Sequence, residues 1–172
     1  MTLSERPRPT TRFDNIEEYA QQFPQLDPEA MRTYLSLRRL DTTLTWALDQ
    51  HFSRHDLSFG RFIVLVNLIR SQGHSQTPAE LSLSCGVTRA TITGLVDTLE
   101  KTGHVVREAD PDDGRSFMVR LTLTGRRFLE KLLPEHFRRM TQLMSGLTHD
   151  EMHDLQRLLS KVANNASAFS DP

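Results

Sequence analysis

The stretch that decides the fold runs from Thr77 to Thr122 and reads TPAELSLSCGVTRATITGLVDTLEKTGHVVREADPDDGRSFMVRLT. Its first four residues, TPAE, match a helix capping box with proline at the first helical position. Gly86 ends this short helix within about two turns, and Thr88 can cap the next one. The pattern predicts two short helices joined by a tight turn.

The second of these helices is followed by a change of period. Its apolar residues are spaced i, i+3, i+4 and i+7, which is typical of one buried helix face: Ile92, Leu95, Val96 and Leu99. After the stop signal at residues 101–103, residues 104–109 and 117–122 are rich in Val, Phe and Thr and predict two short strands. The turn-rich loop 110–116 joins them, so the whole stretch predicts a winged helix-turn-helix.

In such a motif the second helix enters the major groove of DNA and places its N-terminal residues on base edges. The face opposite the apolar residues presents Ala90, Gly94, Asp97 and Lys101, and threonines flank it. Gly94 costs about 1 kcal/mol of helix stability relative to alanine. Arg115, near the tip of the wing, can reach the adjacent minor groove, where negative potential attracts a guanidinium. Asp113 can hold Arg115 in place through a charge-assisted hydrogen bond. The predicted DNA contacts are Thr88, Arg89, Ala90, Thr91, Thr93, Gly94, Asp113 and Arg115. The alternative is an exposed helix with incidental threonines and a surface ion pair.

The sequence VTRATITGLVDTLEKTGHVVREADPDDGRSFMVRLTLTG, residues 87–125, resembles the recognition helix and wing of the multiple-antibiotic-resistance regulator (MarR) family. Asp113-x-Arg115-x-x-x-Val119-x-Leu121-Thr122 matches the wing signature of that family at each fixed position. Many members have a second arginine where this chain has Gly114, which implies weaker wing contacts or a more flexible loop. The likeness in helix order covers residues from about 28 to 167.

The resemblance implies a dimer built from the first and last two helices, with the winged lobes between them and a small-molecule pocket where the two parts meet. We divide the chain into an N-terminal extension (1–26), a helical dimerisation region (27–56 and 123–168) and a winged helix-turn-helix lobe (57–122). The fold class is mainly α with a small two- or three-stranded β wing. The helical region also carries more apolar residues than one small lobe could cover, which independently favours a homodimer.

Local signals also predict where the other helices begin and end. Residues 1–12 lack periodicity, and Asp14 can cap a short helix to Gln22. Asp27-Pro28 starts a long helix, and a helix capped by Ser58, with Leu57 and Phe62 as a hydrophobic staple, is expected to end at Gly73. A helix capped by Thr124 is expected to kink at Pro134, and Thr148 opens the last helix with a capping box.

Composition limits the class of protein. The 172 residues have a formal net charge of −1 and are 37% hydrophobic and 25% charged, as in an ordinary soluble globule. No apolar run is long enough to cross a bilayer, the first residues lack a secretory pattern, and the single cysteine fits a reducing compartment, so we expect a cytoplasmic protein. Residues 77–127 carry seven basic and seven acidic side chains, so charge alone does not indicate DNA binding.

Other chemistries have weaker signals. No phosphate-binding glycine loop, nucleophile elbow or convincing metal triad occurs, so we expect no enzyme, no cofactor and no metal. His149 and His153 in HDEMH are four residues apart, but zinc-protease helices have Glu directly after the first His, so an acidic first helical turn is the preferred interpretation. Cys85 in the helix-turn-helix is interpreted as a small buried hydrophobe and not as a redox sensor.

A further hypothesis concerns an effector. Many MarR-family members detect phenols or aromatic carboxylates, and an aromatic wall with an arginine would suit such a ligand. The candidate lining residues are Arg38, Asp41, Trp46, Arg61 and Phe62. The alternative, that Trp46 and Phe62 belong to the core and the arginines are solvated, is left open.

The sequence therefore predicts a DNA-binding transcription regulator, an effector-responsive repressor that binds a pseudo-palindromic operator as a homodimer. Repression is expected by occupancy of a promoter. Effector binding would change the spacing of the two recognition helices, which must fit major-groove turns about 34 Å apart. The alternative is a winged-helix module that binds only protein.

Overall fold

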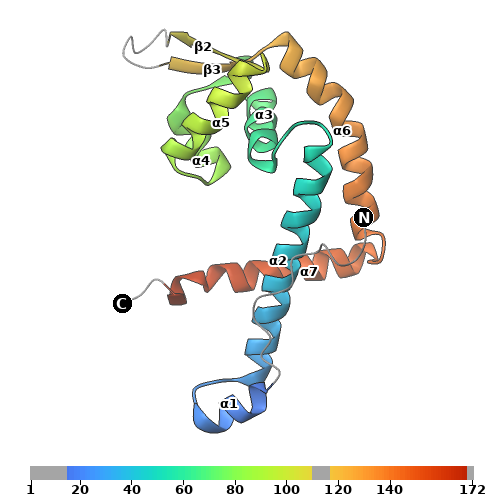
Figure 1. Ribbon diagram of the computed structural model, residues 1–172. Coiled ribbons are helices and arrows are strands. Elements are labelled where there is room, and N and C mark those ends of the chain that lie inside the picture. Colours follow the sequence, from blue (N-terminus) through green and yellow to red (C-terminus); the bar gives the residue numbers. More distant parts are fainter. Residues whose placement is uncertain (1–14, 110–116, 170–172) are drawn as a thin grey trace. The chain divides into compact units, whose positions relative to one another are not determined.

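The computed structural model describes residues 15–109 and 117–169 and is mainly helical with a small three-stranded antiparallel sheet, which confirms the predicted fold class (Figure 1). Its elements are α1 (Ile16–Gln22), α2 (Pro28–Ser53), α3 (Phe59–Arg70), the 3₁₀ turn η2 (Gln72–His74), β1 (Ser75–Gln76), α4 (Pro78–Cys85), α5 (Arg89–Lys101), β2 (Val105–Ala109), β3 (Phe117–Leu121), α6 (Leu123–Met144), α7 (His149–Asn164) and η3 (Ala166–Phe169). The chain divides into two compact units, residues 1–121 and residues 122–172.

The helix-turn-helix forms as predicted. The Thr77 side chain accepts from the Glu80 backbone N–H (3.2 Å), and Glu80 Oε2 accepts from the Thr77 backbone N–H (2.7 Å), so the capping box is complete. Gly86 ends α4 with a φ of +66°, a left-handed conformation that glycine adopts without strain. Thr88 then caps α5 by accepting from the Thr91 backbone N–H (3.2 Å).

The sheet has the strand order β1-β3-β2, with both pairs antiparallel. Val105 pairs with Leu121 and Arg107 with Val119 across the wing, while Ser75 of β1 pairs with Arg120. The sequence pattern did not predict the strand at residues 75 and 76, because two polar residues carry no period-2 pattern. The preceding helix was also placed too long: α3 ends at Arg70, and Gly73 lies in η2 with a φ of +63°.

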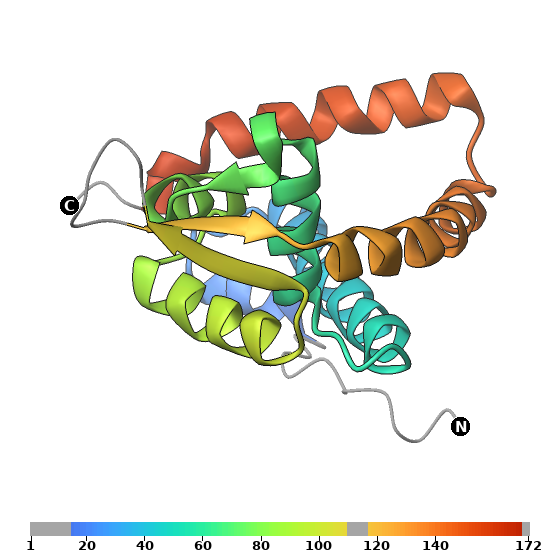
Figure 2. The ribbon, with the colours of Figure 1, turned by 90° about the horizontal axis from the view of Figure 1, so that it is seen from above.

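The core of the first unit joins the end of α2 to the winged helix-turn-helix. The residues with at most 1% exposure are Phe52, Val64, Leu65, Leu68, Leu81, Ile92, Val96, Leu99 and Val119. They come from α2, α3, α4, α5 and β3, whose arrangement can be followed in Figures 1 and 2. The apolar face predicted for residues 92–99 is thereby confirmed as the buried side of α5, with Leu95 half-buried.

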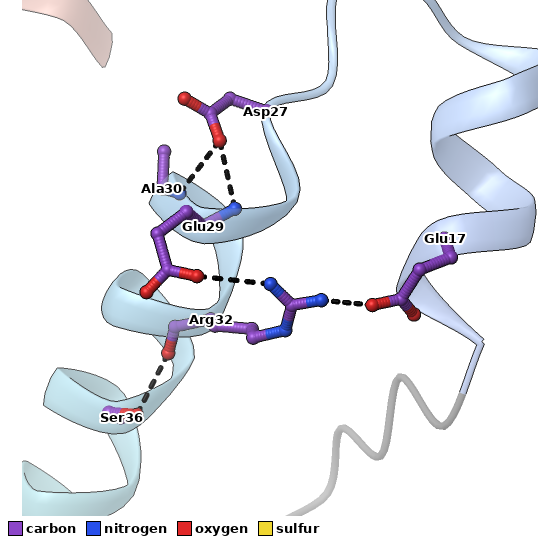
Figure 3. A network of polar contacts seen from close by, with 6 residues as sticks. All are labelled: Glu17, Asp27, Glu29, Ala30, Arg32 and Ser36. Atoms are coloured by element: carbon purple, nitrogen blue, oxygen red, sulfur yellow. Dashed lines mark hydrogen bonds and ion pairs between the residues drawn. The ribbon is translucent and has the colours of Figure 1, made fainter.

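A polar network joins α1 to the first turn of α2 (Figure 3). Asp27 caps α2 by accepting from the backbone N–H groups of Glu29 (2.8 Å) and Ala30 (3.2 Å), as the Asp-Pro pair predicts. Arg32 then forms ion pairs with Glu29 and with Glu17 of α1. The predicted cap Asp14 lies outside the described residues.

In the second unit, one helix start differs from the prediction. Thr122, not Thr124, caps α6, because its side chain accepts from the Gly125 backbone N–H (3.0 Å) and the helix begins at Leu123 directly after β3. Pro134 lies inside this helix, and the kink there stays a prediction. Thr148 opens α7 through the predicted capping box with Glu151.

Helices α6 and α7 carry many exposed apolar side chains. On α7 no residue is buried, and Leu155, Leu158, Leu159 and Val162, which recur at helical spacing, are 38–52% exposed. On α6 the exposed apolar residues are Leu123, Phe137, Met140, Leu143 and Met144. None of the helices within 15–109 and 117–169 is long and apolar enough to span a membrane.

Candidate nucleic-acid interface

The solvent-facing side of α5 gathers the predicted DNA contacts. Its core face is fixed by the buried residues Ile92, Val96 and Leu99. The six described residues that the sequence singled out are all exposed: Thr88, Arg89, Ala90, Thr91, Thr93 and Gly94. They occupy the N-cap and the first turns of the helix, where free backbone N–H groups and the positive end of the helix dipole favour a phosphate.

The threonine hydroxyls on this face are already engaged. Thr93 Oγ1 donates to the Arg89 carbonyl (3.0 Å), and Thr98 Oγ1 donates to the Gly94 carbonyl (3.1 Å). Thr88 and Thr91 share a hydrogen bond between their hydroxyls (2.9 Å). In these rotamers Thr93 and Thr98 offer a ligand their methyl groups and an accepting oxygen, so donation to DNA requires a rotation about χ1.

Gly94 has no steric role within the described chain. Beyond its chain neighbours and the backbone of its own helix, a Cβ built at this position meets no atom within 4 Å, and the residue is exposed in the middle of a helix. Because glycine there costs about 1 kcal/mol relative to alanine, folding alone would favour a different residue. The position is therefore suited to close approach of an external surface to the helix backbone.

Sequence reasoning missed a charged network between α5 and the wing. Arg107 of β2 forms ion pairs with Asp97 and Glu100 of α5, and its guanidinium carbon lies 5.2 Å from the centroid of the Phe117 ring. The hydrogen bond to Asp97, followed by the charge of Glu100, raises the pKa of Arg107 above its usual value. The one available signal was the i, i+3 spacing of the two carboxylates on α5, which does not identify a partner on a strand.

The wing contacts predicted from the sequence, Asp113 and Arg115, lie outside the described residues, as does Gly114. The strands on either side of that loop are described, and β2 and β3 pair over five residue pairs from Val105–Leu121 to Ala109–Phe117. The roles of Asp113 and Arg115 stay predictions that rest on the sequence motif.

The candidate effector residues are spread along α2 and α3. Arg38 and Asp41 are exposed and form an ion pair with each other (3.4 Å). Phe62 is buried against Phe52, with ring centroids 4.4 Å apart. Since α2 rises about 1.5 Å per residue, Arg38 lies about 21 Å along the helix from Phe52. Arg61 Nε donates to Ser58 Oγ (3.1 Å), and Trp46 is half-buried.

The positions of Cys85, His149 and His153 bear on the redox and metal-binding alternatives. Cys85 is half-buried, Asn67 Nδ2 lies 3.6 Å from its sulfur, and burial raises the pKa of the thiol, which disfavours the reactive thiolate. His149 and His153 lie on α7 beside Glu151, whose carboxylate is used in the capping box. Among residues 15–109 and 117–169, no group of three or more His, Cys, Asp or Glu side chains is placed to hold a metal.

Comparisons with known proteins agree with this geometry. The model of the MarR family matches residues 55–116. The HTH-type transcriptional repressor YetL of Bacillus subtilis (strain 168) is 30% identical over 160 residues, which cover 93% of this chain and 96% of the relative. The solved structure of Sco3205, a MarR family transcriptional regulator from Streptomyces coelicolor in complex with DNA, has a TM-score of 0.77 at 27% identity and covers 81% of this chain and 89% of its own.

A second DNA complex is also similar. A mutant of MarR from E. coli complexed with operator DNA has a TM-score of 0.70 at 27% identity, over 78% of this chain and 95% of that one. The near-complete coverage of the repressor from Bacillus subtilis, together with the winged helix-turn-helix described above, settles the family. The chain belongs to the MarR family of transcription regulators.

Proposed function

We propose that this protein is a DNA-binding repressor that acts as a homodimer on a pseudo-palindromic operator. Each α5 enters a major groove, and the two wings reach the adjacent minor grooves. Promoter occupancy then blocks transcription. Relatives named as repressors and similar chains solved with DNA support this proposal.

The observation that carries the proposal is the exposed N-terminal half of α5. A buried apolar face fixes the helix, and in its N-terminal half the opposite face offers small side chains, hydroxyls and Arg89. This combination lets a helix backbone come close to a groove while Arg89 reaches a base edge or a phosphate.

A mobility-shift titration on the DNA upstream of the gene, at two salt concentrations, tests the proposal. We expect sequence-selective binding that weakens with salt, because phosphate contacts release counterions. Arg89→Ala and Arg115→Ala should each weaken binding roughly tenfold, the size of one good base or phosphate contact.

The matched control is Arg157→Ala, which removes an arginine from α7 that pairs with Asp154. It should bind within about twofold of the wild type, because an exposed ion pair contributes little. Absence of DNA binding by the wild type even at low salt would contradict the proposal and favour the alternative, a winged-helix module that binds protein only.

Gly94→Ala should separate stability from DNA binding. The added methyl meets no described atom beyond its chain neighbours and its own helix backbone, so we expect the free energy of unfolding to rise by up to about 1 kcal/mol. Operator affinity should fall about tenfold or more, because the methyl occupies the space that DNA needs. Urea unfolding and mobility shift measure the two effects. Ser160→Ala on α7 is the control, with equal affinity expected; unchanged affinity of Gly94→Ala would show that DNA does not approach α5 at this point.

The dimer and its effector belong to the same proposal. The apolar faces of α6 and α7, exposed in the single chain, supply area for a second copy. Two linked lobes also explain how a lobe with balanced charge could bind DNA tightly. An aromatic or phenolic effector is also proposed, and it rests on the resemblance to the family, because Arg38 lies about 21 Å along α2 from Phe52, the ring against which Phe62 packs. By binding differently to two dimer geometries, the effector would release the operator.

A further inference from the structure

Arg107 is held in one place by contacts from three directions. Its guanidinium pairs with Asp97 and Glu100, which lie one turn apart on α5. Its backbone N–H donates to Glu100 Oε1 (3.1 Å), and its side chain lies over the Phe117 ring on β3. The side chain is 27% exposed, so these charges are partly shielded from water.

The two carboxylates are unfavourable neighbours for DNA. The charged residues of α5 are Arg89, Asp97, Glu100 and Lys101, two positive and two negative, which sum to zero. Both acidic groups lie in the C-terminal half, and Asp97 belongs to the outward face that continues from Gly94. Glu100 also lies in the last turn, where the helix dipole disfavours a negative charge. Neither carboxylate therefore serves the helix or a phosphate backbone directly.

We propose that Arg107 is a positioning residue for DNA binding: it neutralises Asp97 and Glu100 and holds both carboxylates toward the sheet, away from the phosphates. With Arg107 counted, the four residues Asp97, Glu100, Lys101 and Arg107 sum to zero instead of −1. Charge-assisted bonds between a strand and a helix also keep α5 and the wing in register. This inference rests on the proposed DNA binding.

The neighbouring arginine shows that this arrangement is particular to Arg107. Arg120 of β3 pairs with Glu108 of β2 (2.6 Å) and donates to the Gly73 carbonyl (2.7 Å). None of the contacts described for it involves α5. Arg120→Gln removes the same charge from the same sheet without uncovering a carboxylate on α5, so it is a matched control.

The test compares four variants with the wild type in operator titrations at low and high salt: Arg107→Gln, Asp97→Asn/Glu100→Gln, the triple variant with all three changes, and Arg120→Gln. We expect Arg107→Gln to bind about tenfold more weakly at low salt, with a smaller defect at high salt, because salt screens the uncovered carboxylates. The triple variant should recover to within about threefold of the wild type. Arg120→Gln and the double variant should stay within about threefold.

Two kinds of result would overturn the inference, and a third would refute the proposed function. If the wild type binds operator and Arg107→Gln binds equally well, Arg107 has no role in DNA binding. If Arg107→Gln is weak but the triple variant stays weak, or the defect does not shrink with salt, the role is structural and not one of charge. Failure of the wild type itself to bind DNA would instead refute the proposed function, on which the inference depends.

Discussion

Phe52→Ala is expected to lower the free energy of unfolding by about 3–5 kcal/mol, the usual cost of removing a fully buried phenylalanine. Phe52 is 0% exposed. Its ring centroid lies 4.4 Å from that of Phe62 and 5.9 Å from that of Phe59. Because Phe52 lies in the last turn of α2 and Phe62 lies in α3, the cavity would open where these two helices meet. A typical domain has only about 5–15 kcal/mol of stability in total.

Urea unfolding followed by the fluorescence of Trp46 or by circular dichroism measures this loss. The comparison needs equal protomer concentrations, since dimerisation would add to the apparent stability. Phe59→Ala is the control, because Phe59 belongs to the same ring cluster but is 36% exposed. It should lose less than half as much free energy. Equal losses for the two variants would contradict the assignment of Phe52 to the centre of the core.

Local sequence signals predicted the helix starts well, because a cap is a contact over three residues. Asp27, Ser58, Thr77, Thr88 and Thr148 all cap helices as expected. Thr124 was wrong because Thr122 and Thr124 are both plausible caps by local rules. Pairing of β3 with β2 extends to Leu121, so the helix starts at once after the strand, and that tertiary constraint is absent from the local pattern.

Helix periodicity alone was enough to predict which residues of α5 are exposed. Once Ile92, Val96 and Leu99 are assigned to the core, the exposure of Ala90, Thr93 and Gly94 follows from helix geometry. Arg107 was not predictable in the same way. Its contact with Asp97 spans ten residues and depends on how β2 packs against α5, which no short pattern specifies.

Leu158→Glu is expected to convert the proposed dimer into a monomer and to reduce operator affinity about 100-fold or more. Leu158 is 50% exposed on α7 and lies on one face with Leu155, Leu159 and Val162. In a dimer that buries this face, the new carboxylate would be desolvated without a partner, at a cost of several kcal/mol. A monomer holds only one half-site. Loss of the second linked lobe removes the gain in affinity of about 10²–10⁴-fold that two tethered sites provide.

Light scattering after size exclusion measures the mass, and mobility shift on the full operator measures the affinity. Ser160→Glu is the matched control, because it places the same charge on the polar face of α7, where the Ser160 hydroxyl donates to the Gln156 carbonyl (2.8 Å). We expect it to have twice the mass of the chain and nearly full affinity. A monomeric wild type would contradict the dimer directly. A dimeric Leu158→Glu that binds operator like Ser160→Glu would show that the apolar face of α7 is not the interface, since a lone carboxylate could not be buried there without cost.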